Sequence, residues 1–263
     1  MLGERVTGWR RVAGAMWSAP DDPQIFGAMD VDASAVLAFI ADAKARGQRV
    51  TATHVVGRAI AHALVEVPDL NVRIRRGRSV ARPSIDIFFI TAVENGRDLS
   101  GVKIANVDRK TSVEVGAELA SRAAALKGGR DPQFARSKRM LDALPARLLR
   151  RALRGTAFLT EELGLNLPAL GLSRAPFGSA MVTSVGMFGI PQGFAPLAWM
   201  YDVPLLVLVG EIAPKPVVVA GRVEVRDMLP ITATIDHRYA DGWHISRAMA
   251  AFREYLAAPE RFG

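Results

Sequence analysis

The sequence predicts an α/β fold. Short apolar runs bounded by turn residues alternate along the chain with longer segments whose apolar residues recur at helical spacing. One such run, residues 205–209, is wholly apolar and lies between Pro204 and Gly210, which is typical of a buried strand. The chain has 263 residues, of which 50% are hydrophobic, enough for a substantial core in one large domain or two small ones. No apolar run is long enough to cross a bilayer.

The first half of the chain contains clear helix boundaries. Asp32 and Ser34 can cap a helix, and Pro68 ends another. Residues 85–93 are almost wholly apolar, so we expect them to form a central strand. In chain order we expect a helix or arm over 1–17, a strand over 25–31, helices over 34–46 and 53–67, strands over 72–81 and 85–93, and a helix over 112–127.

The second half is richer in strands. Gly221 is suited to a hairpin turn, and a β-type run ends at Ile235. In chain order we expect a strand over 182–185, a turn over 186–189, strands over 198–202, 205–212, 217–219, 222–226 and 229–235, and a helix over 245–256.

A basic segment separates the two halves. The formal net charge is +8, and residues 130–154 hold eight Arg or Lys against two Asp, a net charge of +6. Leucines and arginines alternate over residues 145–157 as in an amphipathic helix. The segment 130–172 either packs its leucines on the domain, with the arginines in water, or docks on a membrane surface or a partner. Residues 130–154 have one Phe and no recognised nucleic-acid motif, which argues against a nucleic-acid partner.

The composition excludes several classes of chemistry. The chain has no cysteine, so disulfides, thiolate nucleophiles and Cys-based zinc sites are excluded, and a cytoplasmic location is expected. The N-terminus lacks the basic-then-apolar pattern of a signal peptide. His54 and His62 lie on a similar face of one expected helix. No third ligand type is near them, so we interpret both as structural and expect no metal site.

The most reactive stretch lies near the C-terminus, at the end of the last expected strand. His237 follows the strand directly and precedes a turn containing Gly242. An imidazole held there can accept a proton near neutral pH. The alternative is a core histidine followed by Asp241 as the N-cap of the next helix.

Several stretches resemble one known family. Asp236-His237-Arg238-x-x-Asp241-Gly242 resembles the D-H-R-x-x-D-G motif of the dihydrolipoamide acyltransferases of 2-oxo acid dehydrogenase complexes, whose H-x-x-x-D-G core chloramphenicol acetyltransferase shares. Residues 181–189 resemble the family's T-I-S-N-L-G-M-F-G, and residues 63–71 resemble its A-L-K-E-V-P-E-L-N. Residues 8–11 and 26–32 fit its opening segment, whereas about 130–172 has no counterpart.

The resemblance implies a two-layer α/β sandwich of the chloramphenicol acetyltransferase type, a mixed sheet backed by helices. It further implies a single catalytic domain over 1–263 with 130–172 as an insert, and a homotrimer or a multiple of trimers. Coenzyme A would be the substrate, without a metal and without a lipoyl group on this chain. The partners would be acyl-CoA and an unidentified acceptor, such as a dihydrolipoyl carrier on another protein.

The resemblance also assigns site residues. His237 would be the general base, and the Thr183 hydroxyl would stabilise the oxyanion, with Ser184 as the second candidate for that role. Asp241 would hold the turn through Arg10, or through the neighbouring Arg11. Gly242 would permit a special backbone conformation or a close approach. Trp243 and His244 are expected to serve packing.

Two departures from the family pattern leave the function open. The P-H-F of the family is Pro23-Gln24-Ile25-Phe26 here, and the lipoyl and subunit-binding domains that normally precede the catalytic domain are not in this sequence. The acceptor is therefore undetermined. The alternative to a CoA-dependent acyltransferase is a catalytically idle trimeric scaffold that uses the basic insert for docking.

Overall fold

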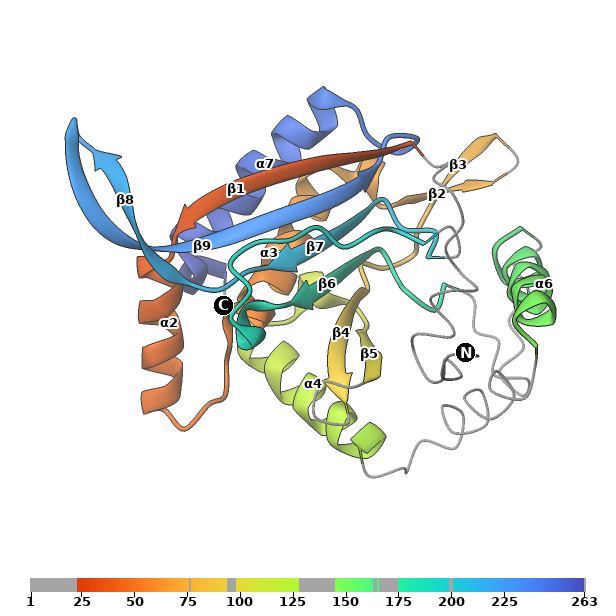
Figure 1. Ribbon diagram of the computed structural model, residues 1–263, viewed down its shortest axis with the longest axis horizontal. Coiled ribbons are helices and arrows are strands. Elements are labelled where there is room, and N and C mark those ends of the chain that lie inside the picture. The colour runs from red at the N-terminus through yellow and green to blue at the C-terminus, as the bar shows by residue number, and fades with distance from the viewer. Residues whose placement is uncertain are drawn as a thin grey trace, which may run out of the picture.

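The computed structural model describes residues 23–75, 77–93, 98–127, 145–162, 165, 175–198 and 201–262. In this part of the chain a seven-stranded mixed sheet packs against a layer of helices, which confirms the expected two-layer α/β architecture (Figure 1). The strands are β1 (Gln24–Asp32), β2 (Val72–Arg75), β3 (Arg78–Ala81), β4 (Ile87–Val93), β5 (Asp98–Ile104), β6 (Ala180–Ser184), β7 (Leu205–Val209), β8 (Ala213–Val219) and β9 (Arg222–Asp236). The helices are α2 (Ser34–Ala45), α3 (Ala52–Glu66), α4 (Ser112–Lys127), α6 (Ala146–Ala157) and α7 (Gly242–Ala257).

The strand order is β1-β9-β7-β6-β4-β5, and β8 pairs with the first half of β9. β4, β6 and β7 are parallel to one another, whereas β9 runs antiparallel to β7 and β1 antiparallel to β9. The carboxyl ends of β6 and β7 therefore lie at one end of the sheet, and the carboxyl end of β9 lies at the other. β2 and β3 form a separate hairpin.

The main core lies between the inner face of the sheet and helices α3 and α7. Alternate strand residues such as Val182, Val207 and Ile231 point into it. A second cluster covers the opposite face of the sheet, where Met181 and Leu206 join Leu149 and Leu153 of α6. The two leucines of α6 thus pack on the domain, as the amphipathic pattern allows, and no helix among the described residues is both long and apolar enough to cross a membrane.

Most expected elements are present with small shifts of their ends. The helix over 112–127 is confirmed, as is the interior position of residues 85–93, since β4 lies between β5 and β6. The hairpin at Gly221 is also confirmed, because Gly221 has φ +80° and Ala220 has φ +49°. The expectations for residues 1–17 and 130–144 fall outside the described residues.

Three strand predictions were wrong. Residues 72–81 form a hairpin rather than one strand, because Gly77 adopts φ +71° and reverses the chain. The described residues of 198–202 are not a strand, and Asp202 has φ +47°. Residues 222–226 and 229–235, expected as two strands, form one continuous strand, β9, whose two halves pair with β8 and β1.

The two helical histidines have structural contacts. His54 completes the capping box of α3, in which Thr51 N–H donates to His54 Nδ1 at 3.2 Å. His62 packs against the rings of Tyr255 and Phe262 in tilted contacts, with centroids 5.8 and 4.6 Å away. Among the described residues no three His, Cys, Asp or Glu side chains form a metal-binding group.

The packing of α6 predicts a difference between two adjacent leucines. Leu149 is fully buried, whereas Leu148 is 47% exposed. Leu149→Ala should lower the free energy of unfolding by about 2–5 kcal/mol, because it leaves a cavity, and Leu148→Ala should have little effect. Urea unfolding followed by circular dichroism measures both. Equal, small losses would show that α6 does not pack on the sheet.

The half-buried capping histidine, His54, predicts a pH effect on stability. Burial, with a smaller contribution from the Arg49 charge, lowers the pKa of His54 from 6.5 to about 4. Between these values the unfolded chain binds a proton that the folded chain does not, so stability falls as the pH drops below 6.5. At pH 5 the loss should be about 2 kcal/mol relative to pH 7.

His54→Gln is the matched variant, because Gln at this position also serves a capping box but does not titrate. Urea unfolding at pH 7 and pH 5 should show a smaller loss in this variant than in the wild-type protein. Identical losses in the two proteins would contradict the assignment to His54.

Candidate active site

His237 lies immediately after β9, on a turn that backbone hydrogen bonds anchor on both sides. The Asp236 N–H donates to Pro204 O at 2.9 Å, and the His237 N–H donates to Pro23 O at 2.8 Å. The rigid end of β9 and the chain entering β1 therefore fix the backbone of His237. The residue itself is exposed, so its imidazole is available to a substrate.

Asp236 and Arg238, the neighbours of His237 in the sequence, form an ion pair with each other. The Asp236 carboxylate is buried and accepts from Arg238 N at 2.9 Å, from Arg238 Nε at 3.0 Å and from Arg238 Nη2 at 2.5 Å. A buried carboxylate is stable only when charged donors satisfy it. The first and third residues of the D-H-R motif thus shape the turn, and the residue between them faces solvent.

A second carboxylate, that of the half-buried Asp202, holds Tyr239 in the turn. Tyr239 donates its hydroxyl to Asp202 Oδ1 at 2.7 Å. The guanidinium groups of Arg73 and Arg82, on and beside the β2–β3 hairpin, lie 3.6 and 3.9 Å from Asp202 Oδ2. Burial, followed by the nearby Asp202 charge, raises the pKa of Tyr239, so the phenol stays protonated as a donor. This network could not be predicted from the sequence, because its members come from three distant segments.

Asp241 caps α7, which is the alternative role considered from the sequence. Its carboxylate accepts from the backbone N–H groups of Trp243 and His244 at 3.0 and 3.2 Å, and it contacts His244 Nδ1 at 2.7 Å. The His244 side chain is the largest cause, and the His244 backbone N–H the next, of a lowered pKa for Asp241. Its expected partners Arg10 and Arg11 lie outside the described residues.

The structure corrects two expectations for this motif. A Cβ built on Gly242 meets no atom within 4 Å, and Gly242 has no left-handed φ. Within one chain, Gly242 is therefore explained neither by a close approach nor by a special backbone conformation. Trp243 is 55% exposed rather than packed, and its ring lies 4.9 Å from the Arg247 guanidinium. The glycine that needs its small size is Gly186 in the second motif, where a Cβ would approach Gly210 O to 2.5 Å.

Thr183 and Ser184 occupy the carboxyl end of β6 and point to opposite faces of the sheet. Thr183 points to the same face as Met181, which belongs to the second cluster. Ser184 points to the same face as Val182, which belongs to the main core. Both are half-buried. Of the two, only Thr183 therefore lies on the face of the sheet opposite helices α3 and α7.

His237 and Thr183 lie at opposite ends of the sheet within one chain. Thr183 pairs with Leu208, which pairs with Thr232 on β9. His237 is five residues further along β9 and its turn, which at about 3.3 Å per residue is roughly 17 Å. One chain does not bring the two expected catalytic side chains to a common reacting atom.

The network beneath the turn predicts the effect of a single hydroxyl. Tyr239→Phe removes the donor to Asp202 Oδ1 and should lower the free energy of unfolding by about 1–3 kcal/mol. Tyr201→Phe is the matched control, because that ring is similarly buried, beside Phe177, and no described residue hydrogen-bonds its hydroxyl. Thermal unfolding compares the two. A loss as large in Tyr201→Phe would show that the Asp202 contact is not the cause.

Three solved structures show the similarity of fold. A probable dihydrolipoamide acetyltransferase from Listeria monocytogenes 4b F2365 has a TM-score of 0.67 at 21% identity, over 90% of this chain and 85% of that chain. The cubic core of the pyruvate dehydrogenase multienzyme complex has a TM-score of 0.70 at 18% identity, over 99% and 94%. Azotobacter vinelandii dihydrolipoamide acetyltransferase has a TM-score of 0.69 at 19% identity, over 99% and 94%.

The sequence comparisons give the family. No curated protein matches the chain. The model of the family described as 2-oxoacid dehydrogenases acyltransferase (catalytic domain) matches residues 4–132 and 174–263 and leaves 133–173 unmatched. This match contains both motifs, the one around Thr183 and the one around His237. The chain therefore belongs to the family of 2-oxoacid dehydrogenase acyltransferase catalytic domains and is an acyltransferase.

Proposed function

We propose that the chain transfers an acyl group between CoA and a thiol or another acceptor at a site shared by two subunits of a homotrimer. His237 of one subunit serves as the general base, and Thr183 of the next stabilises the oxyanion. The observation that carries this proposal is the separation of about 17 Å between the two residues along the sheet of one chain. If both act on one carbonyl, they come from different copies.

The chemistry follows from the two side chains. As the acceptor thiol attacks the thioester carbonyl, His237 takes the thiol proton and the new C–S bond forms. The carbonyl oxygen becomes an oxyanion, to which the Thr183 hydroxyl donates a hydrogen bond. Collapse of the tetrahedral intermediate breaks the bond to the CoA sulfur, and the proton on His237 passes to the departing thiolate. No residue changes its net protonation over the cycle.

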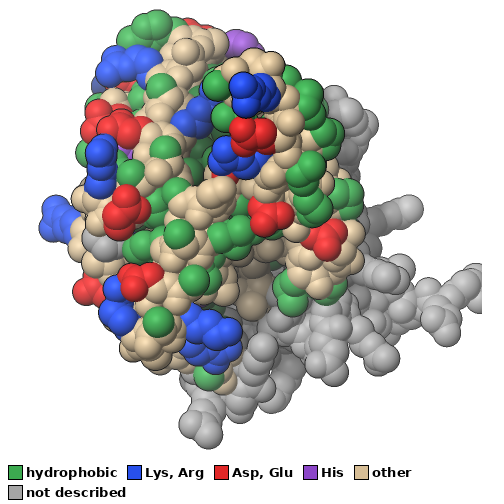
Figure 2. Space-filling model, turned by 90° about the vertical axis from the view of Figure 1, so that its left-hand side faces the viewer, with side chains coloured by type: hydrophobic (Ala, Val, Ile, Leu, Met, Phe, Trp, Pro, Cys, Tyr) green, Lys and Arg blue, Asp and Glu red, His purple; other side chains and the backbone are tan. Residues whose placement is uncertain are grey.

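The surface around Thr183 supports a covering subunit. Met187 is 72% exposed, and Phe188, Ile190 and Phe194 are also exposed, all in the segment that follows β6. The β8–β9 hairpin projects from the domain and presents Val218, Val223 and Val225, each at least 73% exposed. Figure 2 faces the side from which this hairpin projects and shows hydrophobic side chains between charged ones at the surface. Exposed apolar patches of this kind mark association surfaces.

The partners follow from the same chemistry. Acyl-CoA is the donor, and the acceptor is a small thiol or a dihydrolipoyl group on another protein, consistent with the family and with the acetyltransferases of similar fold. Asp241 contributes by fixing the start of α7 behind the catalytic turn. The Asp236–Arg238 pair positions the turn and does not touch the reacting atoms.

Subunit mixing tests the shared site. In thiol exchange with acetyl-CoA, His237→Ala should lose about 10²–10⁴-fold in rate. Thr183→Ala should lose about 10²–10³-fold, and Ser184→Ala, on the other face of the strand, should stay near the wild-type rate. Mixed trimers of the two inactive variants should regain about a quarter of the wild-type rate, because random assembly pairs two intact residues in that share of the interfaces.

Subunit exchange is verified by native mass spectrometry, and light scattering gives the assembly state. Exchange without any recovery of activity, or a monomer at micromolar concentration, would contradict the shared site. Equal background rates for wild type and His237→Ala would instead favour the idle scaffold.

A further inference from the structure

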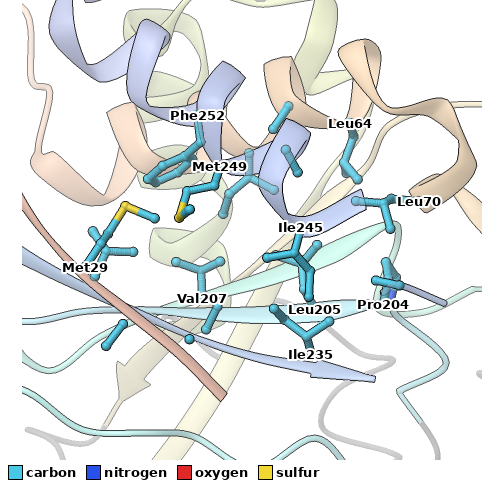
Figure 3. A pocket seen from close by; sticks show the side chains of 18 residues that line it. Met29, Leu64, Leu70, Pro204, Leu205, Val207, Ile235, Ile245, Met249 and Phe252 are labelled. Atoms are coloured by element: carbon cyan, nitrogen blue, oxygen red, sulfur yellow. The ribbon is translucent and has the colours of Figure 1, made fainter. Parts of the chain in front are cut away.

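An apolar cavity of about 300 Å³ lies between the sheet and the helices (Figure 3). Strands β1, β9 and β7 form its floor, and α3 and α7 form its roof. Figure 3 shows Met29, Val207 and Ile235 on the sheet side facing Met249, Phe252 and Leu64 on the helix side. Each of the lining residues is apolar or glycine.

The cavity has a closed side and an open side. The residues contributed by α3, such as Ile60 and Leu64, are buried. The residues contributed by edge strand β1 and by the outer part of α7, such as Gly27, Met29 and Met249, are partly exposed. The opening therefore lies between β1 and α7, where flexible methionines border it from both sides.

Small residues on both layers create the space. Ala233 and Ala248 line the cavity where larger side chains would fill it. Gly27 pairs with Ala233 in the sheet, so the two share a face, and a Cβ built on Gly27 meets no atom within 4 Å. An unfilled apolar cavity destabilises a fold in proportion to its volume. A ligand that enters through the opening and fills this cavity would offset that cost, so the cavity is better explained as a binding site than as a packing defect.

We propose that this cavity binds the aliphatic chain of the acyl group, an assignment that rests on the proposed acyltransferase function. One end of the cavity is lined by Pro204, Leu205 and Ala240. Ala240 is three residues after His237, and Pro204 O accepts the hydrogen bond that anchors Asp236. The cavity thus ends directly beneath the catalytic turn. The lining offers no polar partner, so a ligand with a hydroxyl, an amide or a charge would bury that group unsatisfied. A straight aliphatic chain has no such group and fits the lining.

The volume sets the length of the chain. A cavity of about 150 Å³ holds one benzene molecule, so 300 Å³ holds an apolar group about twice that size, roughly ten to twelve carbon atoms. The substrate class that fits is a medium-chain acyl thioester rather than an acetyl thioester. Each methylene that enters the cavity should tighten binding about fourfold until the cavity is full.

Direct binding tests the cavity without turnover. The full chain is titrated with acetate, hexanoate, decanoate and hexadecanoate by displacement of a fluorescent fatty acid. Affinity should rise up to about ten to twelve carbon atoms and then level off. Gly27→Leu should weaken decanoate binding at least tenfold while its melting temperature stays equal or rises, because leucine fills the space. Gly155→Leu is the matched control, since that exposed glycine of α6 also has an open Cβ position, and its binding should be unchanged.

Ala248→Leu fills the cavity from the helix side and serves as a second variant if Gly27→Leu does not fold. Transfer from acetyl-CoA and decanoyl-CoA is then compared in wild type and in the filled variant, which should lose only the decanoyl reaction. Decanoate binding that ignores both filling variants, or affinity that does not depend on chain length, would overturn the cavity assignment. If no acyl-CoA is transferred by the wild-type protein, the proposed function fails, and the binding experiment still decides whether the cavity takes an aliphatic chain.

Discussion

The turn that carries His237 depends on two carboxylates, one buried and one half-buried, whose hydrogen bonds the fold satisfies. Asp236 is held by Arg238 within the turn itself, and Asp202 receives the hydroxyl of Tyr239 from the turn. Asp202 is in turn flanked by arginines from the β2–β3 hairpin region. A buried charge that loses its partner costs several kcal/mol, so Asp236 in particular needs Arg238. The backbone of His237 is therefore held by its neighbours, and its own side chain takes no part in these contacts.

Strand direction explains why one chain does not bring the two proposed catalytic residues together. β6 and β9 run in opposite directions, and each delivers its motif at its carboxyl end. Thr183 and His237 are therefore at opposite ends of the same sheet, whatever the side-chain conformations. Catalysis by both residues requires an assembly that brings the end of one sheet to the other end of the next. The exposed apolar side chains after β6 and on the β8–β9 hairpin supply surface for it.

Much of the fold was predictable from local pattern, because helix caps and apolar runs act over a few residues. The ends of α4 and the hairpin at Gly221 are examples. The strand over 198–202 was mispredicted because Asp202 adopts a left-handed conformation to reach partners distant in the sequence. For the same reason no local sequence pattern predicted the contact between Asp202 and Tyr239. The motifs located His237 and Thr183, but their spacing carries no information on strand direction, so only the sheet showed how far apart they lie.

β9 is one uninterrupted strand whose two halves have different surroundings. Its first half, paired with β8, carries exposed valines, and its second half carries Ile231, Ala233 and Ile235 toward the helices. Side chains alternate with a period of two, so inserting one residue after Leu229 would turn this inner row outward and swing the threonines and Asp236 inward. The same insertion would displace His237 along the sheet. The fold should therefore accept a change of length in the turn around Gly221 more readily than between residue 229 and the turn that carries His237.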